Sequence, residues 1–582
     1  MTLHAAVARP IRFSSWHLSQ SGQPRIYVPI VKNRARHTKR VHVDHMRSHI
    51  IARLAVTASL CTVTTTLVAQ RRPSAPVTQT PAAAPSLRPV VDAWRRVHER
   101  EILDEAFALL SLPNVASDSV GIRRNIDALT VAFGKRGVTL RPLTAPSGGN
   151  PALVGELNMP GATRTVVMYA HYDGQPVASG GWDGAPFVPE LRHYANSIAG
   201  DAAALPERGD TADSQLRIRA RSASDDKGPI IAMLAALDAM KAQQVAPSIN
   251  VKFFLDGEEE AGDNHLGEIL RAHKATLRAD AWLFFDGPMH VNGAPQLVLG
   301  VRGVTGVDVT FYGANRALHS GHYGNWAPNP AVAVAQFIAS IRDNDGHIRI
   351  ANFYDDVPVI AHADRVSARA LSLTDDSLRT SLGLAHTEAN NAALGERIML
   401  PALNIRGIRA GNVGAGAANA VPTSASVSID FRLVPNQQTA RIRQRLDAHL
   451  KLLGYTVVGS ADAAARSKDR SRLVYVAWDS GYTSVRVPSN TPAVGAVRRI
   501  MARSYGRDPF MLPILGGSLP LFHFVDALGA TVITVPMVNA DNSQHAPNEN
   551  LRLQNLWDGI VLLTDIMTGL GREWPGATKV VP

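Results

Sequence analysis

The sequence predicts an α/β fold in which a domain with a central, mostly parallel sheet is interrupted by an inserted α+β sandwich. Three observations support this fold class. Short apolar runs alternate with helical patterns from about residue 91 to residue 300. After Gly300 the runs change to strands that alternate polar and apolar residues. The first pattern resumes at about Asn490. Strands separated by helices are typical of a parallel sheet, whereas alternating strands indicate a sheet with one exposed face.

Each element follows from hydrophobic periodicity. In the first part we expect helices over 94–111, 120–135, 228–242 and 265–273, and strands over 165–170, 250–255 and 281–285. In the inserted part we expect strands over 301–312 and 425–433, helices over 330–342 and 439–453, and an irregular arm over 350–400. In the last part we expect helices near 492–504 and 551–568.

The charge of the chain is concentrated at its N-terminus. The net charge is +11, and residues 1–72 hold 12 Lys/Arg and one Asp, so the remaining chain carries 48 basic and 48 acidic residues. A nucleic-acid-binding surface would lie on the folded domain. The sequence therefore predicts no nucleic-acid partner.

Residues 46–69 have the layout of a secretory signal peptide. Arg47 and Arg53 precede a mostly apolar stretch over 54–68, and the small residue Ala69 follows it. We expect export to the periplasm or the medium, a natural start near Met46, and no membrane contact in the mature form. An uncleaved anchoring helix is the alternative. Cys61, the single cysteine, lies in this segment, so no disulfide is expected.

The expected organisation is an upstream extension over 1–45, a signal peptide over 46–69 and a linker over 70–90. The α/β domain then covers 91–300 and 488–575, and the inserted domain covers 301–487. At 582 residues the chain is longer than one compact core usually holds, which also indicates two domains.

Metal-ligating residue types follow the strands or open the helices of the first domain. Ligand sites in open α/β sheets gather at the carboxyl ends of strands. A mixture of imidazoles and carboxylates there suits Zn²⁺, Mn²⁺ or Co²⁺ better than Ca²⁺. Any one of these residues alone would more often be an ordinary loop histidine, a helix cap or a solvated acid. The candidates are His171 with Asp173, Asp225-Asp226, Glu258-Glu259-Glu260, Asp286 and His545.

Eight segments in order resemble the signatures of the M20 family of metallopeptidases, over about residues 95–575. The segments are HYDGQP, SASDDKGP, GEEEAGD, FFDG, ALHSGHYG, FRLVPN, GGSLP and NSQHAPNE. The family includes carnosinase-like dipeptidases, glutamate carboxypeptidase, aminoacylase and succinyl-diaminopimelate desuccinylase. The resemblance implies a zinc-peptidase-like catalytic domain, a lid or dimerisation domain inserted into it, and a homodimer formed through that lid.

The resemblance also implies a role for each matching residue. Asp225 would bridge two divalent ions, His171 and Asp286 would complete one site, and Glu260 and His545 the other. A water between the ions would be the nucleophile, Glu259 the general base, and Asp173 the support of His171. Three further groups would hold the substrate: His319 would stabilise the oxyanion at a partner's site, and the substrate carboxylate would be held by Arg432 and by Gly516, Gly517 and Ser518.

The function expected from this resemblance is hydrolysis of dipeptides or short peptides with a free C-terminal carboxylate. Dipeptidase-type relatives usually have Arg-Glu before Gly-Gly-Ser, whereas this chain has Ile514 and Leu515. An N-acyl-amino-acid amidohydrolase is therefore the alternative enzyme. A non-catalytic binding protein on the same fold would be expected to lack ligands or the base, and none of these is missing.

Overall fold

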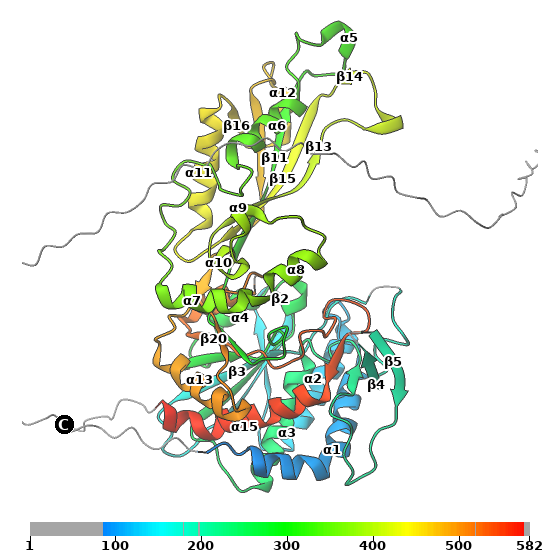
Figure 1. Ribbon diagram of the computed structural model, residues 1–582, viewed down its shortest axis with the longest axis vertical. Helices are drawn as coiled ribbons and strands as arrows, with labels where there is room; N and C mark the ends of the chain where they lie inside the picture. The colour runs from blue at the N-terminus through cyan, green and yellow to red at the C-terminus, as the bar shows by residue number, and fades with distance from the viewer. Residues whose placement is uncertain (1–84, 178–179, 196–197, 518, 575–582) are drawn as a thin grey trace, which may run out of the picture. The chain divides into compact units, whose positions relative to one another are not determined.

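The computed structural model describes residues 85–574 apart from 178–179, 196–197 and 518 (Figure 1). The predicted upstream extension, the predicted signal peptide and most of the predicted linker lie outside the described residues. Helix α1 (Arg88–Leu110) begins six residues before the predicted helix, with a proline in its first turn. Among the described helices, none combines the length and apolar character needed to cross a membrane.

An eight-stranded sheet forms the centre of the first domain. Its order is β1-β2-β7-β3-β8-β20-β9-β19, and the central strands β7, β3, β8 and β20 are parallel neighbours. The strands β1 and β2 are antiparallel to their neighbours. The bounds are Arg141–Ala145 (β1), Gly148–Leu157 (β2), Thr165–His171 (β3), Asn250–Asp256 (β7), Ala281–Phe284 (β8), Gln296–Val298 (β9), Phe510–Leu512 (β19) and Val532–Thr534 (β20).

Helices cover both faces of this sheet, and strand β3 shows why its sequence is continuously apolar. Successive side chains of a strand point to opposite faces. Val166, Met168 and Ala170 join one buried cluster, while Val167 and Tyr169 join the other. A strand buried on both faces needs apolar residues at every position. This explains the uninterrupted run that predicted the strand.

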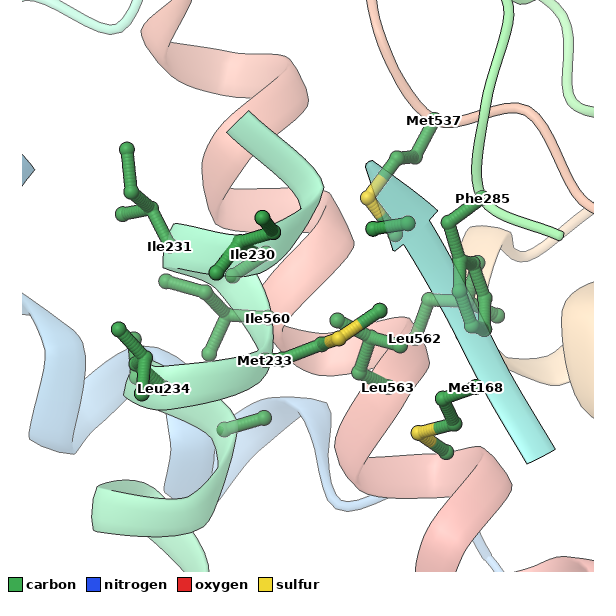
Figure 2. Packing of buried hydrophobic residues seen from close by; sticks show 14 of the residues in the cluster. Met168, Ile230, Ile231, Met233, Leu234, Phe285, Met537, Ile560, Leu562 and Leu563 are labelled. Carbon is green, nitrogen blue, oxygen red and sulfur yellow. The ribbon is translucent and has the colours of Figure 1, made fainter. Parts of the chain in front are cut away.

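The larger cluster lies between the sheet and five helices. Figure 2 shows Met168 and Phe285 beside Met233 of α3 (Lys227–Ala242) and Leu562 of α15 (Leu553–Glu573). The other helices on this face are α1, α2 (Ser119–Gly134) and α13 (Pro492–Tyr505), and the opposite face carries α4 (Leu266–Ala272) and α14 (Leu521–Leu528).

The inserted part has a sheet and a core of its own. Its order is β13-β15-β11-β17-β16, with four strands antiparallel and β16 parallel to β17. Alternate residues of β11, Val307, Val309 and Phe311, are buried together with residues of helices α6 and α11. The bounds are Gly303–Tyr312 (β11), Ala402–Arg409 (β13), Ser424–Leu433 (β15), Thr456–Val458 (β16), Leu473–Trp478 (β17), Pro330–Ile341 (α6) and Thr439–Leu452 (α11).

Two segments contain elements that were not predicted. The arm over 350–400 was predicted to be irregular, but it contains the short helices α7 (His362–Leu371), α8 (Asp375–Ser381), α9 (Glu388–Asn391) and α10 (Leu394–Ile398). These helices bury few side chains, so the polar sequence of the arm has no hydrophobic periodicity that would predict them. The segment after Val188 forms the hairpin β4 (Glu190–Ala195) and β5 (Ile198–Ala203), which joins β6 (Arg217–Arg219) and β21 (Asn550–Arg552) in a four-stranded sheet.

Candidate metal centre

Three neighbouring parallel strands deliver candidate ligands to one edge of the large sheet. His171 is the last residue of β3, Glu259 and Glu260 follow β7, and Asp286 follows β8. Because β7, β3 and β8 are adjacent and parallel, their carboxyl ends meet at the same edge. Asp225 reaches this edge from the turn before α3.

The five predicted ligands form two groups that share one carboxylate. We call His171, Asp225 and Asp286 cluster 1, and Asp225, Glu260 and His545 cluster 2. In each cluster one nitrogen or oxygen of every residue lies within 4.8 Å of the others. The imidazole nitrogen Nε2 of His171 is 2.9 Å from Asp225 Oδ1, and that of His545 is 3.1 Å from Asp225 Oδ2.

The two clusters differ in exposure. His171 is fully buried, and Asp225 and Asp286 are each 6% exposed, so cluster 1 lies inside the protein. The side chain of His545 is 52% exposed, so cluster 2 opens to solvent. A small molecule can therefore approach the pair of clusters from the side of His545.

The three adjacent glutamates do different things. Glu258 accepts hydrogen bonds from the backbone N–H of Asn150 at 2.8 Å and contacts His265 Nδ1 at 2.7 Å, which holds it in a local network. Glu260 lies in cluster 2, 3.3 Å from His545 Nε2. Glu259 has a carboxylate oxygen within 4.8 Å of ligand atoms of both His171 and Glu260. The geometry thus separates one supporting glutamate from two that face the clusters.

Asp173 lies behind His171, as predicted for a residue two positions further along the chain. Its carboxylate oxygen Oδ1 is 3.4 Å from His171 Nδ1, and its Oδ2 accepts from the backbone N–H of Glu260 at 3.1 Å. The backbone oxygen of Asp173 is also 3.2 Å from His171 Nδ1. A proton on Nδ1 leaves the Nε2 lone pair directed at the clusters, which is the tautomer a metal ligand needs.

Burial and mutual repulsion shift the pKa values of the acids. Burial, followed by the charge of Asp225, raises the pKa of Asp286 to about 7. Burial also raises the pKa of Glu259, helped by Asp286 and Glu260. Hydrogen bonds that His545 donates to the carboxylates of Asp225 and Glu260 raise the pKa of His545 to about 10.

Divalent ions fit this set of donors. Several acids crowded into a partly buried site repel one another, and a cation relieves that cost. The donors are two imidazole nitrogens and three carboxylates, which is the mixture that Zn²⁺ and related ions accept. Three protein ligands in each cluster would leave room for a water molecule or substrate on a bound ion, as a catalytic site requires.

The predicted substrate-binding residues are distributed over several elements. Arg432 lies on β15, where its Nε donates to Asp430 Oδ2 at 2.9 Å. Gly516 and Gly517 precede α14, while Ser518 lies outside the described residues. His319 is exposed at the end of the two-residue strand β12 (Leu318–His319), and its Nδ1 accepts from the backbone N–H of Gly321 at 3.1 Å.

The departure from the dipeptidase pattern has a packing explanation. Ile514 is 1% exposed, and Leu515 packs against the smaller buried cluster under α14. The backbone N–H of Leu515 donates to Gly300 at 2.8 Å, at the junction between the two domains. These two residues serve the core of this chain, where charged side chains would need compensating partners.

Sequence reasoning missed two polar residues beside the clusters, Gln175 and Glu549, and did not show what the candidate Asp226 contacts. Gln175 donates to Glu260 Oε2 at 2.6 Å, and Asp226 accepts from the backbone N–H of His171 at 3.2 Å rather than capping α3 with its side chain. Glu549 is fully buried and bonded to the segment that carries Asp225. Gln175 and Glu549 both lie in the matched motifs, but only their partners in space show what they contact.

Known proteins resemble this chain in sequence and in fold. Residues 299–456 match the model of the M20 peptidase dimerisation domain. The chain is 26% identical over 419 residues to the Cys-Gly metallodipeptidase of Schizosaccharomyces pombe, covering 71% of this chain and 81% of that protein. It is 24% identical over 438 residues to the human Beta-Ala-His dipeptidase, covering 73% and 79%.

Solved structures agree with these relatives. An M20 family metallo-carboxypeptidase from Sulfolobus solfataricus has a TM-score of 0.64 and 26% identity, covering 81% of this chain and 99% of that one. Human carnosine dipeptidase 1 has the same fold, with a TM-score of 0.62 and 20% identity over 84% of this chain and 99% of that one. The architecture of a mixed α/β domain with an inserted dimerisation domain is therefore the one seen in M20 metallopeptidases, and the similarities in sequence and fold to M20 metallodipeptidases indicate a hydrolase of the peptidase type.

Proposed function

We propose that this protein hydrolyses the amide bond of dipeptides or short peptides with a free C-terminal carboxylate, using two divalent metal ions. The observation that carries the proposal is the sharing of Asp225 between cluster 1 and cluster 2. One carboxylate with an imidazole on each of its oxygens is suited to bridge two ions. Zn²⁺ is the ion we expect, and Mn²⁺ and Co²⁺ suit the same donors.

The residues of the chain divide the work. When bound, the ions would lower the pKa of a water molecule and polarise the scissile carbonyl. Glu259 takes a proton from the attacking water while the water oxygen bonds to the carbonyl carbon. Glu259 then delivers that proton to the leaving amine nitrogen as the C–N bond breaks. Asp173 holds His171 in the tautomer that leaves Nε2 free.

The substrate end of the site is assigned by its chemistry. Arg432, with the backbone N–H groups of Gly516 and Gly517 and with Ser518, would hold the carboxylate of the substrate. His319 would donate to the developing oxyanion at the site of a second copy of the chain, in a homodimer formed through the inserted domain. The match of residues 299–456 to a dimerisation domain supports that assembly.

A dipeptide substrate is favoured over an N-acyl amino acid because relatives that cover most of this chain are dipeptidases. The proteins named above act on Cys-Gly and on Beta-Ala-His. The two substrate classes differ only on the amine side of the scissile bond. We also propose export through residues 46–69, on the signal-peptide pattern alone.

The test is a substrate panel with defined metals. The purified protein, stripped with a chelator and reloaded with Zn²⁺, Mn²⁺ or Co²⁺, is assayed on dipeptides and on N-acyl amino acids. We expect turnover of dipeptides in at least one metal form. Turnover of N-acyl amino acids alone would transfer the assignment to the amidohydrolase alternative, and no turnover of either class in any metal form would contradict the proposal.

A further inference from the structure

The carboxylate of Glu549 is the most heavily bonded acid beside the clusters. It is fully buried, and its Oε2 accepts from Arg221 Nη1 at 2.7 Å and from the backbone N–H of Ser222 at 2.9 Å. Its Oε1 accepts from the backbone N–H and the hydroxyl of Ser224, both at 3.0 Å, and from the backbone N–H of Asp225 at 2.9 Å. Both oxygens are thus fully used by one short segment, 221–225.

Glu549 connects two segments that are far apart in the sequence. It lies four residues after His545, whereas its partners lie directly before and at Asp225. The backbone N–H of Ala220 also donates to the carbonyl of Glu549 at 3.1 Å, where the β6–β21 ladder ends. Glu549 therefore joins the loop that carries His545 to the turn that carries Asp225.

The geometry requires a carboxylate at this position. All five donors are N–H or O–H groups, so both side-chain oxygens must accept. A glutamine would turn its NH₂ group toward donors on one side and leave them unpaired in a buried place. The Arg221 guanidinium supplies the compensating charge and packs 5.2 Å from the ring of Trp182.

We propose that Glu549 is a positioning residue for cluster 2, setting the separation between Asp225 and His545 that a metal ion requires. The inference rests on the proposed function, because it assumes that these residues bind metal. Residues that hold metal ligands in place typically change metal affinity by about 10–100-fold when they are replaced. We therefore expect Glu549→Gln to weaken one of two Zn²⁺ sites by about that factor.

The experiment is a Zn²⁺ titration of the chelator-treated full chain in competition with a chelating dye, which needs no substrate. Wild type should bind two ions. Glu549→Gln should bind one ion with an affinity near that of wild type and the other about 10–100-fold more weakly. Glu549→Asp keeps the charge but shortens the side chain, and should weaken the same site less. Peptidase activity of the glutamine variant should recover as free Zn²⁺ is raised, which a globally damaged fold would not do.

Asp565 offers a matched control. It is a buried acid that accepts from the hydroxyls of Ser86 and Ser504, both at 2.6 Å, and from the backbone N–H of Leu87 at 2.8 Å, so it resembles Glu549 without touching a cluster. Asp565→Asn should lower the melting temperature and leave both Zn²⁺ affinities unchanged. Equal loss of Zn²⁺ affinity in this control would overturn the positioning role.

The outcomes separate this inference from the function on which it rests. Two wild-type Zn²⁺ affinities retained in Glu549→Gln would overturn the positioning role alone. Failure of the wild-type chain to bind two ions would count against the proposed dinuclear centre itself. If Glu549→Gln does not fold, Glu549→Asp and Ser224→Ala decide the matter, because unchanged Zn²⁺ affinity in both would refute the inference.

Discussion

Replacing Glu259 by glutamine should separate catalysis from stability. The variant keeps the size of the side chain and removes both the proton-accepting group and one negative charge. Loss of a general base lowers kcat by about 10²–10⁴-fold, which corresponds to about 3–5 kcal/mol of transition-state stabilisation. Metal binding should persist, because cluster 1 and cluster 2 are complete without Glu259, which lies with His171 and Glu260 in a third group of possible ligands.

The stability effect should have the opposite sign in the metal-free protein. A carboxylate oxygen of Glu259 lies within 4.8 Å of one of Glu260. Two like charges at that distance repel by about 3 kcal/mol at an effective dielectric constant of about 20, and His171 offsets part of this when it is protonated. Burial first, and then Asp286 and Glu260, also raise the pKa of Glu259, so its charged form opposes folding near neutral pH. Chelator-treated Glu259→Gln should therefore melt at or slightly above the wild-type temperature.

The assay combines kcat on a dipeptide, metal content and thermal melting with and without chelator. Glu258→Gln is the control, since Glu258 bonds Asn150 and His265 instead of facing the clusters. It should keep activity within a few-fold and melt at a lower temperature. Near-normal turnover by Glu259→Gln would show that the residue is not the base, and loss of metal together with activity would show that it is a ligand.

Two further predictions concern the metal site, and a third concerns a buried histidine of the inserted domain. Chelator treatment should abolish activity and lower the melting temperature, since a ligand at 100 times its Kd contributes about 2.7 kcal/mol; an unchanged melting temperature would contradict a structural contribution from metal. Asp173→Asn should weaken metal binding by about 10–100-fold through the misoriented imidazole of His171, and wild-type affinity in a titration would exclude that role. Burial lowers the pKa of His449, whose Nε2 lies 2.9 Å from the hydroxyl of Ser340. The folded protein therefore binds this proton less readily than the unfolded chain, and stability is lost as pH falls below about 6.5. His449→Gln should flatten the melting temperature between about pH 6.5 and 5, and an unchanged acid-side slope would refute the assignment.

Most elements of the fold were predictable because their patterns reflect burial directly. The predicted strand over 250–255 and helix over 439–453 match β7 and α11 within a residue or two. The strand is buried on both faces, and the helix presents Ile442, Leu446 and Leu450 to one core, so in each case sequence periodicity reports the environment. The hairpin β4–β5 and the helices of the arm were missed because they bury little apolar surface and leave no such pattern.

The sequence by itself determined the chemical types at the site and their order along the chain. Placement after buried strands marked several polar residues as candidates at the sheet edge, and the resemblance of the motifs to the M20 family singled out His171, Asp225, Glu260, Asp286 and His545 as ligands. Their assembly into two groups around Asp225 was decided by tertiary structure, since it depends on the strand order β7-β3-β8 and on a loop more than 300 residues away along the chain. Tertiary structure also distinguishes Glu258 from Glu259 and Glu260, because Glu258 alone contacts Asn150 and His265. Adjacent residues of one type are equivalent in a sequence and become distinct only when neighbours from other segments surround them. The same reason explains why Glu549, an acid in a polar loop, acquired its contacts with the Asp225 segment only in the folded chain.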